Sequence, residues 1–276
     1  MHMLIGPVGN LDEVHVRFAL EAAAAATPVA GGRHWRFRCT ERSIELYAEL
    51  GGHTRTADPR GRAIRLQCGA ALLNLRLAIR ASGVVADVRL LPDPRRADFI
   101  ASVGCLILAG PMGASERRLV EVIHPGTLAD RSPGTSLPAA LLGDLRAAAR
   151  VELAWLSEIT QDDRSGVEYL LRSVPGGDSS TGPLLVSIGS LTDQPLDHIT
   201  AGQATQRVAL SAQAASVSVL SVPQLIAGDD ARLALRRRLG GGLWPQSVLS
   251  VRYRSRRTPA TGGSYEPQPA TVPDLR

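Results

Sequence analysis

Lysine is missing from this sequence, and that absence already narrows the possible chemistry. All 31 basic residues among the 276 are arginine. The chain therefore has neither a Schiff-base lysine nor the lysine of a phosphate-binding P-loop. Aromatic residues make up only 4% of the chain, whereas hydrophobic residues make up 44%. We therefore expect a globular core built mainly from Ala, Val, Leu and Ile.

Cysteine is scarce, and long apolar runs are missing. The three cysteines, Cys39, Cys68 and Cys105, are odd in number and far apart. They argue against a disulfide framework and favour a reducing compartment. No Cys or His pair has zinc spacing, so no metal site is predicted. No apolar run of about 18 residues occurs, and the first residues do not resemble a signal peptide, so we expect a cytoplasmic protein without a membrane span.

The positive net charge of +5 invites a nucleic-acid interpretation, which the pattern does not support. Most arginines are interleaved with acidic residues, and no basic run is paired with aromatic residues that could stack on bases. We predict no nucleic-acid partner.

The central element that the sequence predicts is a helix over Gln67–Ser82, which is apolar on nearly all sides and is followed by Gly83. Its pattern recurs. Residues Gly69–Val84 and Gly202–Val217 match in Gly, Ala, Leu and Val, and each segment is followed by a predicted strand and then a proline. Recurrence in the same context predicts two related units in one chain.

The remaining periodicities alternate between helical and extended segments. A hairpin is predicted over Trp35–Leu50, and one long helix is predicted to run from about Ser136 to Ile159. Other helices are expected at Asp12–Ala26, Ser115–Ile123, Asp197–Val217 and Asp229–Leu239, and other strands at Val84–Leu91, Val103–Ala109, Leu184–Ile188, Ser218–Val222 and Gln246–Arg254. We expect an α+β fold with a first half at 10–160, a flexible connection near 173–182, a shorter second half at 183–254, and a disordered tail at 255–276.

Five short segments stand in a characteristic order along the chain: Trp35-Arg36-Phe37-Arg38, Asp58-Pro59-Arg60-Gly61-Arg62, Cys68-Gly69-Ala70-Ala71-Leu72, Gly202-Gln203-Ala204 and Pro245-Gln246. Together they resemble the nitroreductase superfamily, and especially its Acg-type proteins, in which two nitroreductase-like halves are fused and imitate a homodimer. The resemblance covers roughly residues 20–254. It implies FMN between the halves, NAD(P)H as electron donor, and a nitro compound, quinone or similar acceptor. The flavin would then carry the chemistry, so no catalytic side chain is expected.

The sequence departs from the family where the flavin ligands are expected. The polar loop residues of the family are replaced by Ala and Gly apart from Arg33, and Thr127 alone survives in the segment that supplies phosphate-binding arginines. In the last strand, Ser250 stands where an Arg is expected. The resemblance leaves as candidate cofactor-binding residues Arg33, Trp35, Arg36, Thr127, Arg131, Gln246 and Arg252.

Two functions therefore remain open from the sequence. One is an FMN-dependent NAD(P)H oxidoreductase with a degenerate flavin site. The other is a flavin-less protein of the same fold that binds a different small ligand or a partner protein. Among single residues, Trp35 is expected either beside the flavin or in the core, and Cys68 in the core. Asp58 and Arg62 are expected to cap or fix the loop before the central helix.

Overall fold

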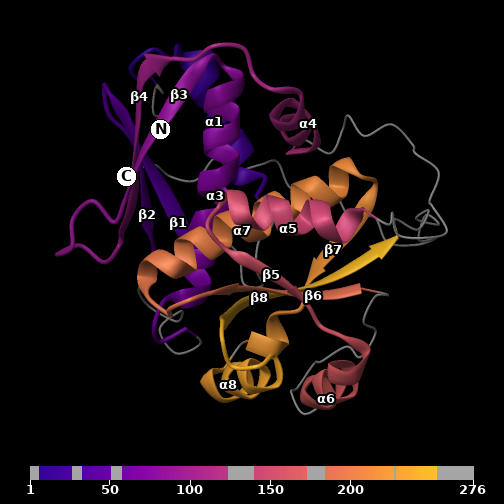
Figure 1. Cartoon of the computed structure of the whole chain (residues 1–276). Coiled ribbons are helices and arrows are strands. Elements are labelled where there is room, and N and C mark those ends of the chain that lie inside the picture. The colour runs from indigo at the N-terminus through magenta and orange to yellow at the C-terminus, as the bar shows by residue number, and fades with distance from the viewer. Residues whose placement is uncertain are drawn as a thin grey trace, which may run out of the picture.

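The computed structural model describes residues 6–26, 33–50, 58–123, 140–172, 184–226 and 228–253. Its elements, labelled in Figure 1, are helices α1 (Glu13–Ala24), α3 (Arg62–Ala81), α4 (Ala114–Ile123), α5 (Leu141–Val151), α6 (Gln161–Arg172), α7 (Pro195–Ala214) and α8 (Asp229–Arg238), the short 3₁₀ helix η1 (Pro223–Ile226), and strands β1 (Trp35–Cys39), β2 (Ser43–Ala48), β3 (Val84–Leu90), β4 (Phe99–Leu108), β5 (Trp155–Glu158), β6 (Leu184–Ser190), β7 (Val217–Ser221) and β8 (Trp244–Tyr253).

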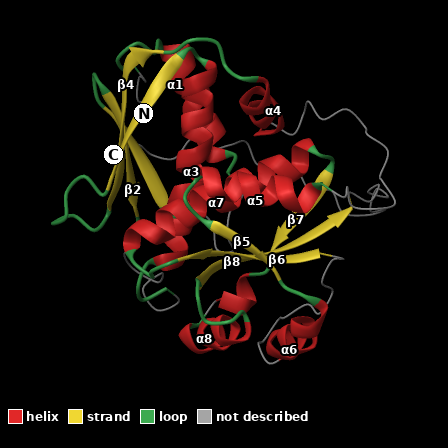
Figure 2. Cartoon of the chain, viewed as in Figure 1, coloured by secondary structure: helices red, strands yellow, loops and turns green. Residues whose placement is uncertain are grey.

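The strands form two antiparallel sheets with the same connectivity. The first has the order β1-β2-β4-β3 and the second β5-β6-β8-β7. Each sheet is preceded by one helix, α1 or α5, and a second helix, α3 or α7, joins its second strand to its third. This arrangement of sheets and helices confirms the prediction of an α+β chain with two similar halves. Figure 2 shows the paired helices lying between the two sheets.

The repeat predicted from the sequence is confirmed by the central helices. Both α3 and α7 have 20 residues. The first residues of the two helices, Arg62 and Pro195, are separated by 133 positions, and so are the first residues of β3 and β7, Val84 and Val217. The turn between helix and strand also recurs, because Gly83 and Ser216 both have positive φ angles, of 78° and 63°.

The two central helices approach each other most closely at one glycine from each. A Cβ added to Gly69 would lie 2.1 Å from the carbonyl oxygen of Ile199, and a Cβ added to Gly202 would lie 2.1 Å from that of Leu66. Each glycine thus faces the residue three positions before the other, as an approximate two-fold axis requires. Backbones this close leave no room for any side chain.

The core follows the predicted pattern of α3. Most of its residues are buried, and its one fully buried amide, Asn74, is hydrogen-bonded on both sides. Asn74 Nδ2 donates to the carbonyl oxygen of Ala22 at 2.9 Å, and Asn74 Oδ1 accepts from Gln206 Nε2 at 3.1 Å. These bonds tie α1, α3 and α7 together, as a polar group buried in an apolar core requires.

The predicted long helix ending at Ile159 is wrong. Helix α5 ends at Val151, the chain turns at Leu153 with a φ angle of 54°, and β5 pairs with β6 of the second sheet. Val151 and Trp155, which a continuous helix would place on the same buried face as Leu145 and Ala148, are 62% and 40% exposed. The predicted first half, 10–160, thus includes a strand of the second sheet. The predicted linker at 173–182 and tail at 255–276 lie outside the described residues.

A further layer covers the second sheet on the side away from α5 and α7 (Figure 1). It consists of α6, η1 and α8, which are inserted between the strands of the second sheet. It encloses a small apolar cluster of Ile159, Val167, Leu185, Leu225, Ile226, Leu235 and Val248. None of the described helices is long and apolar enough to cross a membrane.

Candidate functional site

Each sheet has a β-bulge at the same place, between its two central strands. In the first sheet Leu46 pairs with Ala101 and Tyr47 with Phe99, so Ile100 is skipped. In the second, Ile188 pairs with Ser247 and Gly189 with Pro245, so the skipped residue is Gln246. Ile100 and Gln246 are both fully buried. A bulge turns a side chain away from the regular alternation and is often found beside functional sites.

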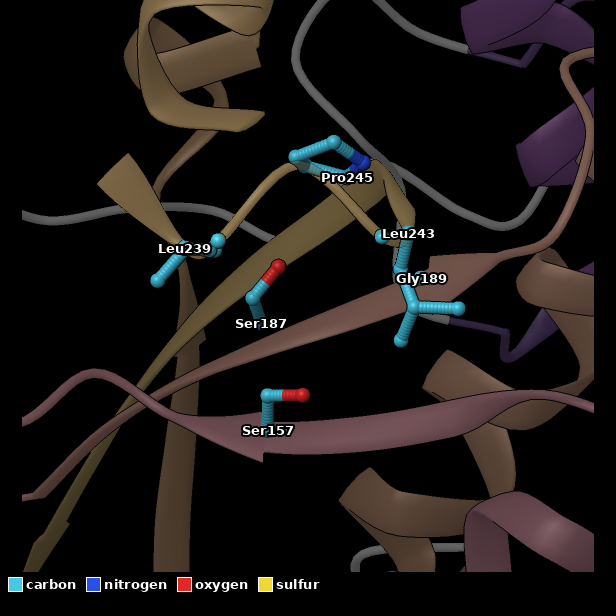
Figure 3. A pocket seen from close by; sticks show the side chains of 8 residues that line it. Ser157, Ser187, Gly189, Leu239, Leu243 and Pro245 are labelled. Atoms are coloured by element: carbon cyan, nitrogen blue, oxygen red, sulfur yellow. The ribbon is translucent and has the colours of Figure 1, made fainter. Parts of the chain in front are cut away.

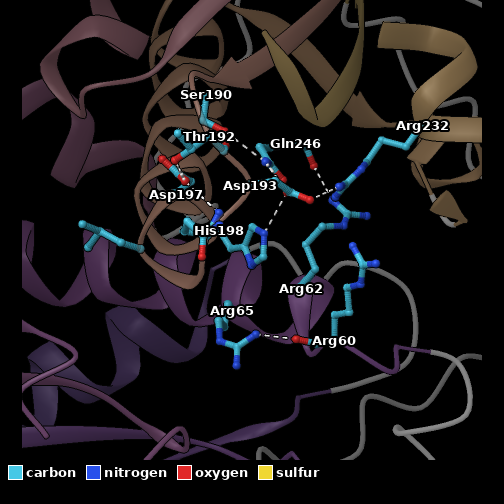
Figure 4. Close-up of polar contacts among 12 residues, drawn as sticks. Arg60, Arg62, Arg65, Ser190, Thr192, Asp193, Asp197, His198, Arg232 and Gln246 are labelled. Atoms are coloured by element: carbon cyan, nitrogen blue, oxygen red, sulfur yellow. Dashed lines mark hydrogen bonds and ion pairs between the residues drawn. The ribbon is translucent and has the colours of Figure 1, made fainter. Parts of the chain in front are cut away.

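The bulge in β8 points Gln246 into a group of buried and half-buried polar side chains, which we call the junction cluster (Figure 4). Its members, from four separate segments, are Arg62, Ser190, Asp193, His198, Arg232 and Gln246. Gln246 Nε2 donates to Ser190 Oγ at 3.0 Å and to Asp193 Oδ1 at 2.9 Å. Asp193 is also ion-paired with Arg232 from α8.

His198, on the second turn of α7, completes the shell of Asp193. Its Nε2 lies 3.0 Å from Asp193 Oδ1, and its side chain is 5% exposed. Burial raises the pKa of Asp193, but hydrogen bonds from Gln246, Arg232 and His198 outweigh it and lower the pKa to about 2. Burial also lowers the pKa of His198, against the opposing effect of Asp193. The cluster therefore holds a carboxylate beside a neutral imidazole at neutral pH.

Arg62 connects the first unit to this cluster. Its Nη1 donates to the carbonyl oxygen of Gln246 at 2.9 Å, and its Nη2 donates to that of Ile226 at 2.5 Å. Both acceptors belong to the second unit and are uncharged. Burial and the nearby Arg232 lower the pKa of Arg62 to about 10. The carboxylates of Asp58, Asp193 and Asp229 act on the pKa of Arg62 in the opposite direction, without forming an ion pair with it in the described part of the chain.

Asp58, in the loop before α3, fixes the start of this helix and with it Arg62, as predicted. Asp58 Oδ1 accepts from the backbone N–H of Arg62 at 2.9 Å, and Oδ2 accepts from that of Ile64 at 3.1 Å. Gly61, just before the helix, has a φ angle of 64°, in the left-handed region that favours glycine. The carboxylate therefore caps the positive end of the helix.

A cavity of about 170 Å³ lies beside this loop. Its charged lining residues are Arg60, Arg65 and Asp58, and the rest of its wall is uncharged. Arg65 Nη1 donates to the carbonyl oxygen of Arg60 at 2.5 Å, and Arg60 Nη2 lies 3.4 Å from Asp229 Oδ2 of α8.

Several buried polar atoms around the junction have no hydrogen-bond partner in the described part of the chain. They are Arg65 Nε, His198 Nδ1, Arg232 Nε and Gln246 Oε1. Native proteins rarely leave such atoms unpaired without a bound water, ion or ligand. The set combines cationic donors with neutral acceptors, which matches a ligand that carries an anionic group and a hydrogen-bonding edge.

The described residues show no group of three or more His, Cys, Asp or Glu side chains able to hold a metal ion. Cys68, predicted to lie in the core, is fully buried, and burial raises the pKa of its thiol.

Comparison with known proteins gives related sequences but no matching family model. The chain is 24% identical to "Putative NAD(P)H nitroreductase Rv3131" of Mycobacterium tuberculosis strain H37Rv, over 87% of this chain and 85% of that protein. It is 27% identical to "Putative NAD(P)H nitroreductase acg" of the same strain, over 32% of this chain and 27% of that protein. The chain is a distant homologue of these two proteins.

The structure of this nitroreductase homologue places the predicted cofactor residues in different surroundings. Trp35 is 6% exposed in the core, with its ring centroid 5.1 Å from that of Phe37. The Arg36 guanidinium carbon lies 4.6 Å from the Tyr47 ring centroid. Both residues belong to β1 of the first sheet, and both side chains are engaged within that sheet.

The other predicted residues are spread over the second sheet and the loops. Gln246 belongs to the junction cluster. Arg252, six positions further along β8, has its Nε 3.3 Å from Ser250 Oγ. Arg33 is exposed just before β1, while Thr127 and Arg131 lie outside the described residues. Of the seven, only Gln246 lies in the junction cluster, and their role as flavin ligands stays a prediction.

The partners of Gln246 were not predicted from the sequence of this nitroreductase homologue. Asp193, His198 and Arg232 lie 53, 48 and 14 positions from it, and no motif connects them. One signal was available. The stretch Thr192–His198 is polar and leads into a helix through a capping box formed by Gln194 and Asp197, a context that holds side chains in fixed positions.

Proposed function

We propose that this chain is an oxidoreductase of the nitroreductase type, which uses FMN as cofactor and NAD(P)H as electron donor. Its two units would stand in for the two subunits of a homodimer. The main support is that the similarity to "Putative NAD(P)H nitroreductase Rv3131" extends over 87% of this chain and so includes both units. The electron acceptor would be a nitro compound, a quinone or a similar small molecule.

We place the boundary between the units in the segment 124–139, ahead of α5. The pairing of β5 with β6 supports this boundary, because it assigns α5 and β5 to the second sheet. Each unit then consists of a helix, two strands, a second helix and two strands. The first unit carries α4 in addition, and the second carries α6, η1 and α8.

Charge and hydrogen-bonding type around the junction support FMN. Arg62 of the junction cluster and Arg65, three positions further along α3, are the cations we assign to the flavin phosphate, and the unpaired Gln246 Oε1 is the acceptor we assign to an N–H of the ring. Arg33, Arg252, Thr127 and Arg131 stay proposed ligands at the margin. When bound, the flavin would accept and donate the electrons, and the protein would bind and orient it.

One cofactor per chain follows from the difference between the two bulges. Ile100 occupies in the first sheet the position that Gln246 occupies in the second. Pro195 begins α7 where Arg62 begins α3, and proline supplies no side-chain donor. The second junction of a symmetric dimer would therefore lack both polar groups.

The experiment is to purify the chain, record its visible spectrum, and titrate it with FMN. We expect a yellow protein that releases FMN on denaturation, and NAD(P)H-dependent bleaching of the bound flavin. Arg62→Met should weaken FMN binding by at least tenfold, because a charge-assisted contact contributes about 1.5–3 kcal/mol. Arg95→Met, on an exposed turn, is the matched control and should bind as wild type.

The second candidate is the flavin-less protein, which the small size of the described cavities favours. The cavity beside the loop before α3 and the one on the second sheet measure about 170 and 190 Å³, whereas ligand pockets typically span roughly 300–1,000 Å³. In addition, Asp58 already caps α3 and Asp193 already pairs with Arg232. A colourless protein that stays colourless with excess FMN would end the first candidate and leave the second.

A further inference from the structure

A second cavity, away from the junction, lies on the outer face of the second sheet beneath the turn between α8 and β8 (Figure 3). Its volume is about 190 Å³. Ser157 of β5 and Ser187 of β6 form its floor, and Gly242, Leu243 and Pro245 line its other side.

The two serines are a cross-strand pair, because Ser157 lies opposite Ser187 in the sheet. Ser187 is 3% exposed. In the described part of the chain neither hydroxyl has a hydrogen-bond partner, and both side chains face the cavity in Figure 3. The two hydroxyls therefore open onto the cavity, where water or a ligand can supply their hydrogen bonds.

The equivalent pair in the first sheet is charged. Counted from the bulge, Arg38 and Glu45 occupy the places of Ser157 and Ser187. Their side chains form an ion pair at 3.8 Å, with Arg38 64% exposed. The second unit therefore has uncharged hydroxyls where the first has an ion pair, together with the added helices that close the space above them.

Glycines shape the roof of this cavity. A Cβ on Gly189 would lie 3.0 Å from Leu243 Cβ, so glycine at this position allows the turn to pack closely against the sheet. Gly240 and Gly241 have φ angles of 84° and 74°, which other residues rarely adopt. The turn is thus held in a conformation that leaves the space beneath it open.

Size and chemistry limit what this space can hold. The volume corresponds to about six water molecules at roughly 30 Å³ each. None of the described residues that line it is charged. We propose that it binds a compact, neutral, hydroxyl-rich molecule of the polyol class, held by Ser157 and Ser187. This site does not depend on the proposed flavin function, although Gly189 and Pro245 adjoin Ser190 and Gln246 of the junction cluster.

The test is a titration of the full chain with glycerol, monitored by the methyl NMR signals of Leu239 and Leu243. We expect saturable shifts of these signals, and at least a fivefold weaker affinity in both Ser157→Ala and Ser187→Ala. Lactate has the same number of non-hydrogen atoms but is anionic, so it should not produce the shifts. Saturation is the decisive readout, because glycerol excluded from the surface stabilises proteins without saturating.

The control variant is Ser221→Ala, an exposed serine on β7 of the same sheet. It should bind glycerol as wild type does. Shifts that never saturate, or saturable binding that survives in Ser187→Ala, would overturn the proposal. Equal binding of lactate and glycerol would overturn the neutral class. Thermal unfolding of each variant confirms that it is folded before its affinity is compared.

Discussion

The two sheets of this chain share their strand order and the position of their bulge, yet their outer faces differ. On the first sheet Arg36 lies over Tyr47, which stacks on Phe99 with ring centroids 4.7 Å apart. None of the described helices lies on that side in Figure 1. On the second sheet the same face is covered by α6, η1 and α8. A duplicated frame can therefore be kept while one copy gains a layer, a polar cluster and a cavity.

The feature that the two units share is the contact between their central helices. Gly69 and Gly202 meet at the approximate two-fold axis, where a change in either affects the same interface. What diverged lies away from that axis, at Ile100 and Gln246, where each unit is free to change alone. The following predictions test this division.

The largest effect is expected at the helix crossing, and it should be equal in the two units. Gly69→Ala and Gly202→Ala each place a methyl group about 2.1 Å from a carbonyl oxygen, so the helices must separate. We expect each to destabilise the fold by more than about 4 kcal/mol. Urea unfolding measures this. Gly143→Ala on α5, with nothing within 4 Å, is the control and should stabilise by about 0.5–1 kcal/mol. Unequal losses of stability in the two variants would contradict the equivalence of the two glycines.

The next largest effect concerns the second unit alone. Asp193→Asn keeps the shape but leaves Arg232, which is 2% exposed, without its counter-charge. Removing one partner of a buried pair typically costs about 3–5 kcal/mol. Asp193→Asn combined with Arg232→Met should recover part of this loss. If the single variant unfolds at the wild-type urea concentration, the cluster contributes nothing to stability.

A third prediction replaces the apolar bulge residue of the first unit, Ile100, with the glutamine found in the second. Ile100→Gln buries an amide in an apolar core, and we expect a loss of about 3 kcal/mol from the unpaired amide and the lost packing. Ile100→Leu, the volume-conserving control, should cost less than about 1.5 kcal/mol. A well-tolerated glutamine at this position would mean that the first junction can also accept a polar side chain.

The fold was largely predictable from the sequence, because its central helices repeat a pattern that local residues determine. The α5–β5 boundary was missed for a local reason. Leu145, Ala148, Val151 and Trp155 continue at helical spacing, and the turn at Leu153 uses a left-handed leucine where glycine is usual. The site was only partly predictable. Gln246 belonged to a recognised motif, whereas its contacts depend on a bulge and an inserted helix.

A fourth prediction concerns pH and again separates the units, because His198 belongs to the junction cluster. Burial lowers its pKa below 6.5, Asp193 opposes this, and Arg62 and Arg65 reinforce it. The unfolded chain therefore binds the proton more readily than the folded one. Stability contributed by neutral His198 is complete above about pH 6.5, its value in the unfolded chain, and is lost progressively as the pH falls from there through the lower pKa of the folded state. Urea unfolding between pH 5 and 8 should show a shallower decline in His198→Gln; parallel curves would contradict the assignment.

The smallest effect is expected on the open face of the first sheet. Arg38 and Glu45 are 3.8 Å apart, with Arg38 64% exposed, so water and salt screen their attraction. A double-mutant cycle with Arg38→Ala and Glu45→Ala should give a coupling below about 1 kcal/mol, smaller still in 1 M salt. The cycle is needed because Tyr47 Oη also donates to Glu45 Oε2 at 2.8 Å, which makes either single variant ambiguous. A coupling above about 2 kcal/mol would show that this face is as shielded as that of the second sheet, and the contrast between the two units would then lose its basis.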